Sequence, residues 1–292
     1  MDEFEPIVRA SSPALDAILG KPFPVLNHGF VRVIDYMGDE AAILQMARVS
    51  YGKGTKSLNE DKGLLRYLMR HRHTSPYEGN ELKLHIKLPI FVMRQLIRHR
   101  TASVNEYSMR YSEPKDEFFV PELDTIQLQS KDNKQGRGGA VEDEVRHDFR
   151  RRTILAANTA MEYYDGFNEE GIAREMNRVN LPVSVYTECY WKIDLHNLLH
   201  LLKLRTDPHA QYEVRVYADI ILDEIVKAWL PNVYEAFLDY NKEAVTFSKQ
   251  EMEVLRAHLS PAVTGKAYKE SLKAKGVSTR EADEFVLKVG AK

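Results

Sequence analysis

Residues 81–89 read ELKLHIKLP, which is the clearest structural pattern in the chain. Apolar and polar side chains alternate without exception from Glu81 to Leu88, and this predicts a β-strand with one face buried and the other in water. Pro89 ends the strand and can open a helix, because the amide hydrogen that it lacks has no partner in a first helical turn. We predict that helix over residues 90–100, with Ile90, Val92, Met93 and Leu96 in the core and a polar end formed by Arg94, Gln95, Arg98, His99 and Arg100.

The segments around this unit add a second strand and several helices. Residues 30–36 form the second predicted strand, and Asp39 is a suitable N-cap for the helix that we expect after it. Helical periodicity is found again in four later stretches, residues 64–69, 143–164, 191–204 and 208–229. In the second of these, the expected core residues are Val145, Phe149, Leu155 and Tyr163. These elements predict an α+β fold, in which a mostly antiparallel sheet is flanked by helices.

Composition divides the chain into three parts. Residues 1–27 carry several prolines and little periodicity, and we expect them to form a leader packed on the surface. Residues 28–244 form the predicted main domain, interrupted at 122–142 by a loop insertion that contains glycines and lysines. From residue 245 the chain becomes rich in Lys and Glu, which indicates a helical C-terminal extension over 245–292.

The charge and cysteine content exclude several classes of protein. The 292 residues include 41 basic and 43 acidic side chains, a formal net charge of −2, which argues against a protein that coats nucleic acid or an anionic membrane. Cys189 is the single cysteine, so a disulfide within the chain and zinc sites built on paired cysteines are excluded. No apolar run approaches the roughly 20 residues that span a bilayer, and the acidic N-terminus is unlike a secretory signal. We therefore expect a cytoplasmic protein.

The densest group of polar side chains lies in residues 98–111, RHRTASVNEYSMRY. Three cations at a helix end are compatible with the negative end of the helix dipole, and taken alone they are also typical of a solvated surface. The serines, the asparagine and the glutamate that follow are unusual in a plain surface turn. Arginine binds phosphate oxygens in a bidentate manner, whereas Asn, Glu and Ser can read the edge of a heterocycle. The combination favours a binding site over a surface turn.

This stretch resembles the family motif of flavin-dependent thymidylate synthases, and each position of that motif is matched: Arg98, His99, Arg100, Ser103, Asn105, Glu106, Ser108 and Arg110. Two further blocks are similar to the same family, HTSPYE at residues 73–78 and LRTDPHAQ at residues 204–211. The resemblance covers residues 30–240, approximately. It implies the fold of that family and a homotetramer with its sites at subunit interfaces. The implied partners are small molecules, with neither nucleic acid nor a membrane among them.

The reaction that the resemblance implies is the reductive methylation of dUMP to dTMP, a step of nucleotide biosynthesis. 5,10-Methylenetetrahydrofolate would supply the carbon, and FAD reduced by NADPH would supply the hydride. Arg205 is implied as the catalytic group, a fixed guanidinium that stabilises enolate-like charge as carbon 5 of the uracil attacks. The implied dUMP contacts are Gln95, Leu96, Ile97, Arg98, Glu106, Tyr107, Ser108, Met109, Arg110, Arg178 and Arg205. The implied FAD contacts are Ser75, Arg98, His99, Arg100, Glu106, Asp194, Leu195, His196 and His200, and no metal site is implied.

Several alternatives remain open from the sequence. Cys189 could add to the uracil ring as a thiolate, although an apolar, helical setting favours a packing role. His196 and His200 lie four residues apart on a predicted helix and could bind a metal, but no third ligand accompanies them. The arginines and tyrosines of residues 98–111 could instead bind RNA, and a flavoenzyme of another function could carry the same cofactor contacts. Bound flavin would exclude an RNA-binding module, and a dUMP-dependent change in the flavin spectrum would exclude an unrelated flavoenzyme.

Overall fold

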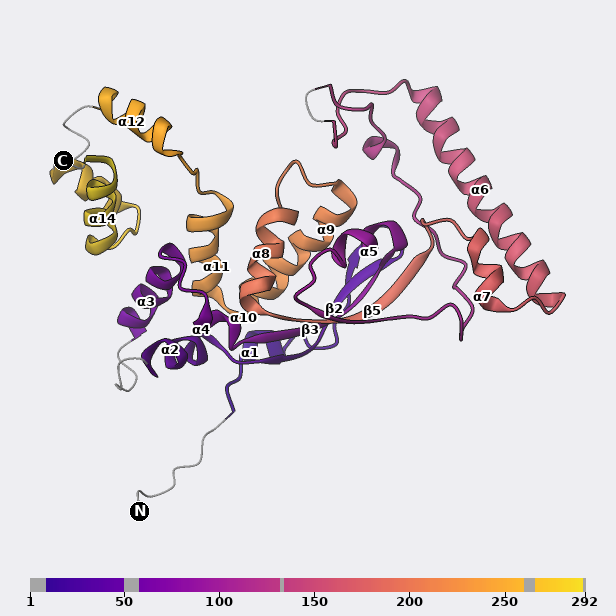
Figure 1. Ribbon diagram of the computed structural model, residues 1–292, viewed down its shortest axis with the longest axis horizontal. Coiled ribbons are helices and arrows are strands. Elements are labelled where there is room, and N and C mark those ends of the chain that lie inside the picture. Colours follow the sequence, from indigo (N-terminus) through magenta and orange to yellow (C-terminus); the bar gives the residue numbers. More distant parts are fainter. Residues whose placement is uncertain (1–8, 50–57, 132–133, 260–265, 291–292) are drawn as a thin grey trace, which may run out of the picture. The chain divides into compact units, whose positions relative to one another are not determined.

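The computed structural model describes residues 9–49, 58–131, 134–259 and 266–290 (Figure 1). The chain splits into two compact units, Met1–Lys242 and Glu243–Lys292. The larger unit contains the sheet and the residues that the sequence singled out. The expectations for residues 1–8 of the leader and for residues 260–265 of the extension lie outside the described residues.

An antiparallel sheet forms the centre of the larger unit. Its strands are β1 (Phe23–Val25), β2 (Gly29–Met37), β3 (Glu81–Pro89), β4 (Ser103–Glu106) and β5 (Tyr186–Asp194). They follow the order β1-β2-β3-β5-β4, and each pair of neighbours is antiparallel. The predicted α+β fold with a mostly antiparallel sheet is therefore confirmed.

The strand predicted at residues 81–88 is the middle strand of the sheet, and it pairs along its whole length with β5. Its leucines face the core as predicted. The opposite face is drier than predicted, because His85 and Lys87 are also buried. Carboxylates satisfy both side chains: His85 Nε2 lies 2.8 Å from Glu188 Oε2, and Lys87 pairs with Glu117.

The helix predicted at residues 191–204 begins later than expected. The preceding stretch, also expected to be helical, belongs to β5, and α8 covers Leu195–Arg205. The Asp194 carboxylate sets the boundary, because it accepts the backbone N–H of Asn197 at 2.9 Å and so caps the first turn of α8. The side chains of β5 that are buried in the core alternate along the strand, as the period of a sheet requires: Cys189, Trp191 and Ile193.

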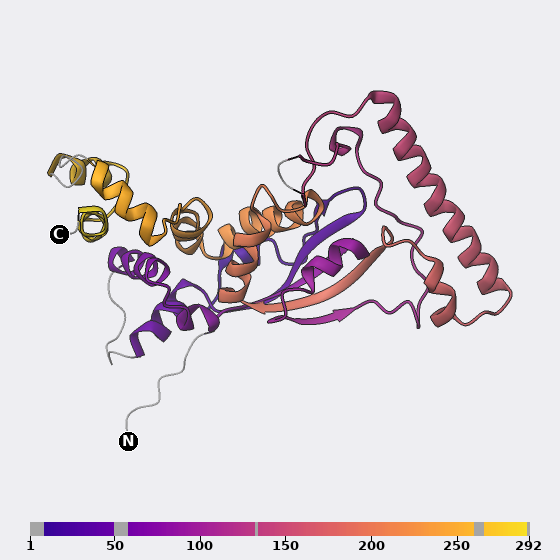
Figure 2. The ribbon, with the colours of Figure 1, turned by 45° about the horizontal axis from the view of Figure 1, so that its top comes forward.

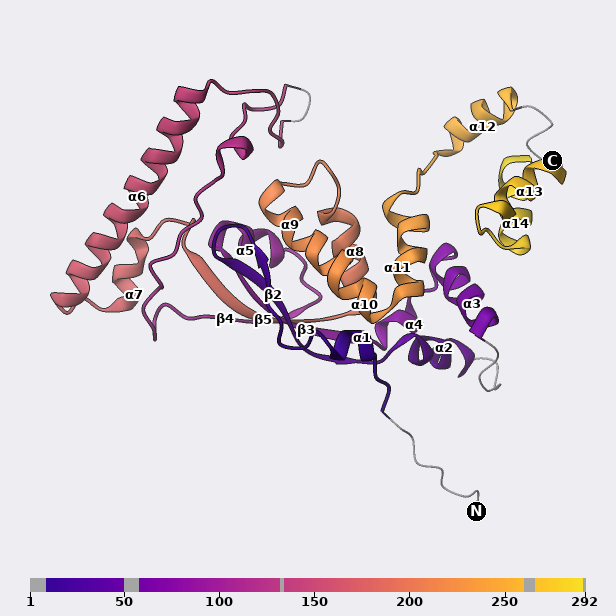
Figure 3. The ribbon, with the colours of Figure 1, turned by 180° about the vertical axis from the view of Figure 1, so that it is seen from behind.

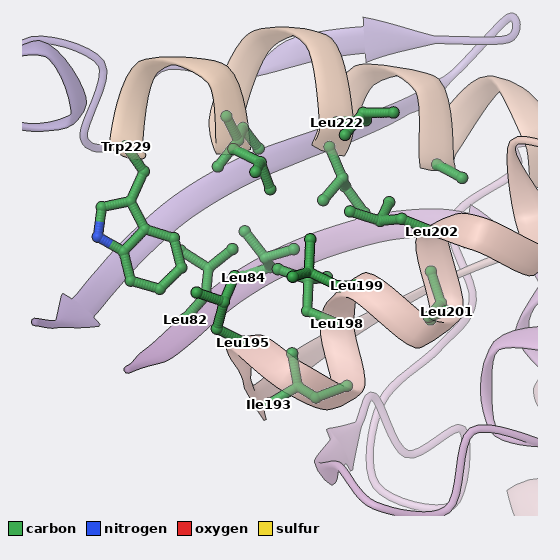
Figure 4. Packing of buried hydrophobic residues seen from close by; sticks show 14 of the residues in the cluster. Leu82, Leu84, Ile193, Leu195, Leu198, Leu199, Leu201, Leu202, Leu222 and Trp229 are labelled. Atoms are coloured by element: carbon green, nitrogen blue, oxygen red, sulfur yellow. The ribbon is translucent and has the colours of Figure 1, made fainter. Parts of the chain in front are cut away.

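Helices from separate parts of the sequence pack on the sheet. They are α5 (Ile90–Leu96), α8 and α9 (Tyr212–Ile220), and the orange helices α8 and α9 lie together on one side of the strands (Figure 2). Leucines of β3 and α8 meet Leu222 in the resulting core, with Trp229 at one end of the cluster (Figure 4). This packing places the ends of α5 and α8 close to each other.

Two of these helices differ in extent from the prediction. α5 ends at Leu96, so residues 97–100 form turns in place of a last helical turn. The helix expected from residue 208 begins at Tyr212, because the Asp207 carboxylate accepts the His209 N–H at 2.8 Å and stabilises a turn there. α9 then continues through the π-helical segment η3 (Ile221–Val226) into α10 (Lys227–Trp229).

The leader is not confined to the surface as predicted. Leu15, Phe23 and Val25 are buried in the main core, and β1 extends the sheet by pairing with β2. Asp39 acts as the predicted cap, since its carboxylate accepts the Ala42 N–H at 2.8 Å.

The remaining helices before β3 are α1 (Pro13–Asp16), α2 (Glu40–Val49), α3 (Leu58–Arg70) and α4 (Ser75–Glu78). Later in the chain, α11 (Pro231–Phe237) packs against α3 and is followed by η4 (Leu238–Lys242).

The helix predicted at residues 143–164 is present and longer, as α6 (Asp143–Glu169), and it extends away from the sheet (Figure 3). The prediction of its core residues is wrong: Val145, Phe149, Leu155 and Tyr163 are all exposed. A different face of α6 is buried, and its residues Ala157, Met161 and Tyr164 form a small second core with Met109, Phe118 and Val185. Periodicity located the helix but did not show which apolar side chains pack within the same chain.

Two segments lie outside the sheet and its helices. Residues 122–142 contain the short 3-10 helix η1 (Leu123–Thr125) and a bridge between Gln129 and Arg137. The smaller unit consists of α12 (Lys249–His258), α13 (Lys266–Ala274) and α14 (Thr279–Gly290). None of the helices in the described ranges combines the length and the apolar character needed to cross a bilayer.

Candidate active site

Arg205 ends α8, and three neutral acceptors hold its guanidinium. Its Nε donates to His99 Nε2 at 3.1 Å, its Nη1 to the side-chain oxygen of Gln95 at 3.3 Å and its Nη2 to the backbone oxygen of Gln95 at 3.4 Å. Gln95 belongs to α5 and His99 to the turn after it, so two sequence blocks that lie about a hundred residues apart meet here. Because none of these acceptors is a carboxylate, the positive charge of Arg205 is not neutralised by them.

The surroundings of Arg205 keep His99 uncharged. Burial, followed by the charges of Arg205 and His200, lowers the pKa of His99 to about 4. The His200 ring lies 6.3 Å from the His99 ring. A neutral imidazole at pH 7 can accept the Arg205 N–H, whereas an imidazolium has no free acceptor. Burial also lowers the pKa of Arg205. His99 therefore supports Arg205 without adding a second cation.

Three residues of the family motif, Ser103, Asn105 and Glu106, lie on β4, an edge strand that is exposed along its whole length. Its last residue, Glu106, accepts a hydrogen bond from Thr187 Oγ1 at 2.9 Å. Tyr107 follows the strand and is fixed at both ends, because its N–H donates to Glu188 O at 2.8 Å and its hydroxyl to Glu113 O at 2.6 Å. An open edge strand carrying polar residues presents them to a ligand or to another chain.

A second group of predicted dUMP residues lies beside α7 (Arg174–Asn177) and η2 (Arg178–Asn180). Arg110 pairs there with Glu175 at 3.1 Å, and its N–H donates to Ser108 Oγ at 3.4 Å. Arg178 is exposed, and its guanidinium has no hydrogen bond or ion pair among the described residues. α7 lies well away from α8 in Figure 1 and Figure 3, so within one chain this group is separate from Arg205. Of the other predicted contacts, Leu96 and Met109 are buried, and Ile97 and Tyr107 are exposed.

The remaining predicted flavin residues gather at the start of α8. α4, whose first residue is Ser75, packs against α8, and the Leu195 N–H donates to Asn80 O at 2.8 Å. Asp194 accepts both the backbone and the side-chain amide of Asn197, at 2.9 and 2.6 Å. Leu195 is fully buried, His196 is half-buried and His200 is exposed. Asp194 and His196 thus lie at the same end of α8. Asp194 also caps the helix, in addition to its predicted contact with the flavin.

The donor set suits a flavin dinucleotide and a nucleotide phosphate. Phosphate groups need cationic donors that are not already paired. Arg98 and Arg100 are exposed, and in the part of the chain that the structure describes their side chains are unpaired, like that of Arg178. A metal ion fits less well, because no group of three His, Cys, Asp or Glu side chains in the described ranges is placed to hold one.

Cys189 is a poor candidate for the nucleophile. Its side chain lies in the core of the sheet, 2% exposed. Burial, together with the charge of Glu106, raises its pKa to about 12. The thiolate fraction at pH 7 is then on the order of one in 100,000, and the thiol is the inert form. The packing role that the sequence favoured for Cys189 is confirmed.

Sequence reasoning missed a group of polar residues that is linked to Arg205 through Gln95. A cavity of about 600 Å³ lies between residues 122–142 and residues 208–215, and Arg137, Gln211 and Glu213 are among its lining residues. Gln211 is the last residue of the LRTDPHAQ block, without a role in the predicted site, and Glu213 follows it by two positions. An acidic residue this close to a family block was the available signal.

Comparison with known proteins identifies the family. Residues 32–232 match the family model Thy1, described as thymidylate synthase complementing protein. The chain is 50% identical to a flavin-dependent thymidylate synthase of Rickettsia bellii over 95% of this chain and 96% of the relative. It is 51% identical to the enzyme of that name from Ruegeria pomeroyi, over 96% and 92% of the two chains.

A solved structure supports the same assignment. The UMP/dUMP methylase PolB from Streptomyces cacaoi, bound with 5-Br dUMP, matches with a TM-score of 0.69 and 32% identity, over 75% of this chain and 99% of that one. The relatives cover nearly the full length of the chain, and His99 of the motif contacts Arg205 of the LRTDPHAQ block. The chain belongs to the flavin-dependent thymidylate synthases, a family of methyltransferases.

Proposed function

We propose that the chain methylates dUMP reductively to dTMP and that Arg205 is its catalytic residue. The observation that carries this proposal is the setting of Arg205, whose charge is held by neutral acceptors at 3.1 to 3.4 Å. Carbon 5 of uracil is a poor nucleophile, and negative charge builds on the ring as that carbon attacks. A fixed guanidinium beside the ring stabilises this charge in a partly dry site, where electrostatic interactions are strong.

The dUMP phosphate has ligands of its own in addition to Gln95, which also contacts Arg205. We assign it to Gln95, Arg98, Ser108 and Arg110, with Arg178 as a further cation. Arg178 and Arg110 lie beside α7, apart from Arg205 in the same chain, while the unpaired state of Arg178 leaves it free to bind an anion. One dUMP molecule could contact both groups if its phosphate binds Arg178 of one subunit while its uracil binds Arg205 of another.

FAD is assigned to Arg98 and Arg100, of which Arg98 is shared with the dUMP phosphate, and to the start of α8. Arg98, Arg100 and Ser75 would bind its phosphates, and Glu106, Asp194 and the three histidines His99, His196 and His200 would contact the rest. When bound, reduced FAD supplies the hydride. NADPH is the proposed source of that hydride, and 5,10-methylenetetrahydrofolate is the proposed carbon donor. The role of this chain's residues is to orient these groups beside the uracil.

We propose a homotetramer with its sites at subunit interfaces, and α6 supports an assembly of copies. Val145 and Tyr163 are 18 residues apart, as are Phe149 and Phe167, and 18 residues make about five helical turns. Phe149 follows Val145 by four residues, so all four positions lie within about 40° of one another on α6. All four side chains are exposed. The helix buries a different face within its own chain, through Ala157, Met161 and Tyr164. An apolar stripe of this kind on an exposed helix favours burial against a second copy.

The cytoplasm is the proposed location. A single free thiol, buried on β5, suits a reducing compartment, where nucleotide biosynthesis takes place.

Replacing Arg205 by alanine is expected to lower the rate of dTMP formation by roughly 100- to 1,000-fold, because the developing charge on the uracil loses its partner. Bound flavin should remain. Release of tritium from carbon-5-labelled dUMP measures the rate, and flavin absorbance measures the cofactor. Lys203→Ala, an exposed change on the same helix, is the matched control. Near-normal turnover of Arg205→Ala would overturn the proposed role.

Cys189→Ala is expected to remain active, because a thiol with a pKa of about 12 does not act as a nucleophile at neutral pH. The test is the same tritium-release assay, with circular dichroism to check that the fold is retained. Complete loss of activity in a folded variant would restore a thiol mechanism.

Acidification is expected to destabilise the protein partly through His99. The pKa of His99 is about 4 in the folded protein and near 6.5 when the residue is solvated. Between these values the unfolded chain takes up a proton that the folded chain does not, so the free energy of unfolding falls as the pH falls through this window. In His99→Asn the loss of melting temperature from pH 7 to pH 5, at a fixed protein concentration, should be smaller. An unchanged loss would contradict the assignment.

Phe149→Asp should weaken the assembly, because it places a charge in the apolar stripe of α6. Light scattering coupled to gel filtration should show a tetramer for the wild type and smaller species for the variant, with unchanged circular dichroism. Val254→Asp replaces an exposed apolar residue of the smaller unit and serves as the control. A wild-type monomer would refute the oligomer itself, and a tetrameric Phe149→Asp would refute the role of this stripe.

A further inference from the structure

A line of hydrogen bonds leads from the buried carboxylate of Glu213 to Arg205. Gln211 Nε2 donates to Glu213 Oε2 at 2.9 Å, and Gln95 Nε2 donates to Gln211 Oε1. The oxygen of the Gln95 side chain then accepts from Arg205 Nη1 at 3.3 Å. Three segments of the chain contribute to this line: α5, the end of α8 and the start of α9.

The carboxylate sets the direction of every bond in the line. An ionised carboxylate only accepts hydrogen bonds, whereas a glutamine amide has one accepting and one donating end. Gln211 must therefore turn its NH₂ group to Glu213 and its oxygen to Gln95. Gln95 must in turn direct its NH₂ to Gln211, which leaves its oxygen facing the guanidinium of Arg205. Either amide in the reverse orientation would bring two donors or two acceptors together.

Arg137 holds the side chain of Glu213 in place. Glu213 is only 4% exposed, and its second oxygen, Oε1, accepts from Arg137 Nη1 at 3.0 Å. The Arg137 guanidinium also lies over the ring of Tyr212, 5.0 Å from its centroid. Both carboxylate oxygens are thus bound, which offsets the cost of burying the charge. The segment 122–142 takes part in the line through this arginine.

We propose that Glu213 is a positioning residue for the activation of uracil, acting through Gln211 and Gln95 to fix an acceptor against Arg205. This inference rests on the proposed function of Arg205. Glu213 does not touch the substrate. Its effect is to keep the guanidinium in one orientation and to prevent an amide NH₂ from facing it.

The test is Glu213→Gln, which keeps the size of the side chain and removes the fixed polarity. We expect kcat/KM for dUMP to fall by roughly 10- to 100-fold, the scale of a misplaced catalytic group. Flavin content and melting temperature should stay close to those of the wild type. Glu235→Gln is the matched control, because it also replaces one ion-paired carboxylate by an amide, in the exposed pair of Glu235 with Lys62. It should have the kcat/KM of the wild type.

A double substitution separates polarity from simple packing. In Glu213→Gln combined with Gln211→Glu, the new carboxylate at position 211 again accepts from Gln95 Nε2, and the new amide at position 213 can donate to it and accept from Arg137. The oxygen of Gln95 is then returned to Arg205, so most of the lost kcat/KM should be recovered. A purely structural role of Glu213 would give no recovery, since the double variant is the more altered protein.

The outcomes are distinct. Wild-type kcat/KM in Glu213→Gln overturns the inference, as does a folded double variant that is no more active than the single one. If Glu213→Gln does not fold, Gln211→Met is the substitute, because it breaks the same line of hydrogen bonds at an exposed residue. This variant should show the same loss of kcat/KM. Normal kcat/KM in Gln211→Met overturns the inference. Activity of Arg205→Ala would instead refute the proposed function, and an inactive Arg205→Ala beside a fully active Glu213→Gln would refute the positioning role alone.

Discussion

The pairing of β3 with β5 is the constraint on which the rest of the structure depends. Both strands are nine residues long, and they are hydrogen-bonded throughout in an antiparallel ladder at the centre of the sheet. Each leads directly into a helix, β3 into α5 and β5 into α8. Because both helices pack on the core that this pair forms, their far ends meet. Gln95 and His99 at one end thus contact Arg205 at the other.

The electrostatics of this meeting point follow from what surrounds the guanidinium. Arg205 is partly buried and is bound by amide, carbonyl and imidazole groups, all of which are neutral. A carboxylate in direct contact would have satisfied the charge and left little attraction for a uracil ring. The carboxylate of Glu213 instead acts through the side-chain amides of Gln211 and Gln95. It orients the acceptor that faces Arg205 without neutralising the positive charge of the guanidinium. Cys189, buried on β5 with a raised pKa, has no comparable access to a ligand.

The groups proposed for one reaction are divided between two regions of a single chain. Arg205 lies by α5 and α8, whereas Arg110 and Arg178 lie by α7, next to the long helix α6. α6, which carries the exposed apolar stripe, contacts α7 and η2, and Arg110 follows the exposed edge strand β4 in the sequence. An Arg178 that is unpaired within the described ranges, on the same side of the chain as uncovered apolar surface of α6, suits assembly from several copies, and this is the physical basis for the proposed sites between subunits.

Local sequence determined the alternating strand at residues 81–88, the Asp39 cap, the positions of most helices and the motif that identified the family, since each of these depends on neighbours in the chain. It misjudged the start of α8, because the apolar residues of β5 just before Leu195 can be fitted to a helical period, and only the Asp194 cap fixes where the helix begins. It also placed the apolar residues of α6 in the core, since periodicity carries no information on what covers a face. Only the tertiary structure decided that residues near 95, 137, 205 and 213 meet, because hydrogen bonds between distant segments form where packing brings their donors and acceptors together.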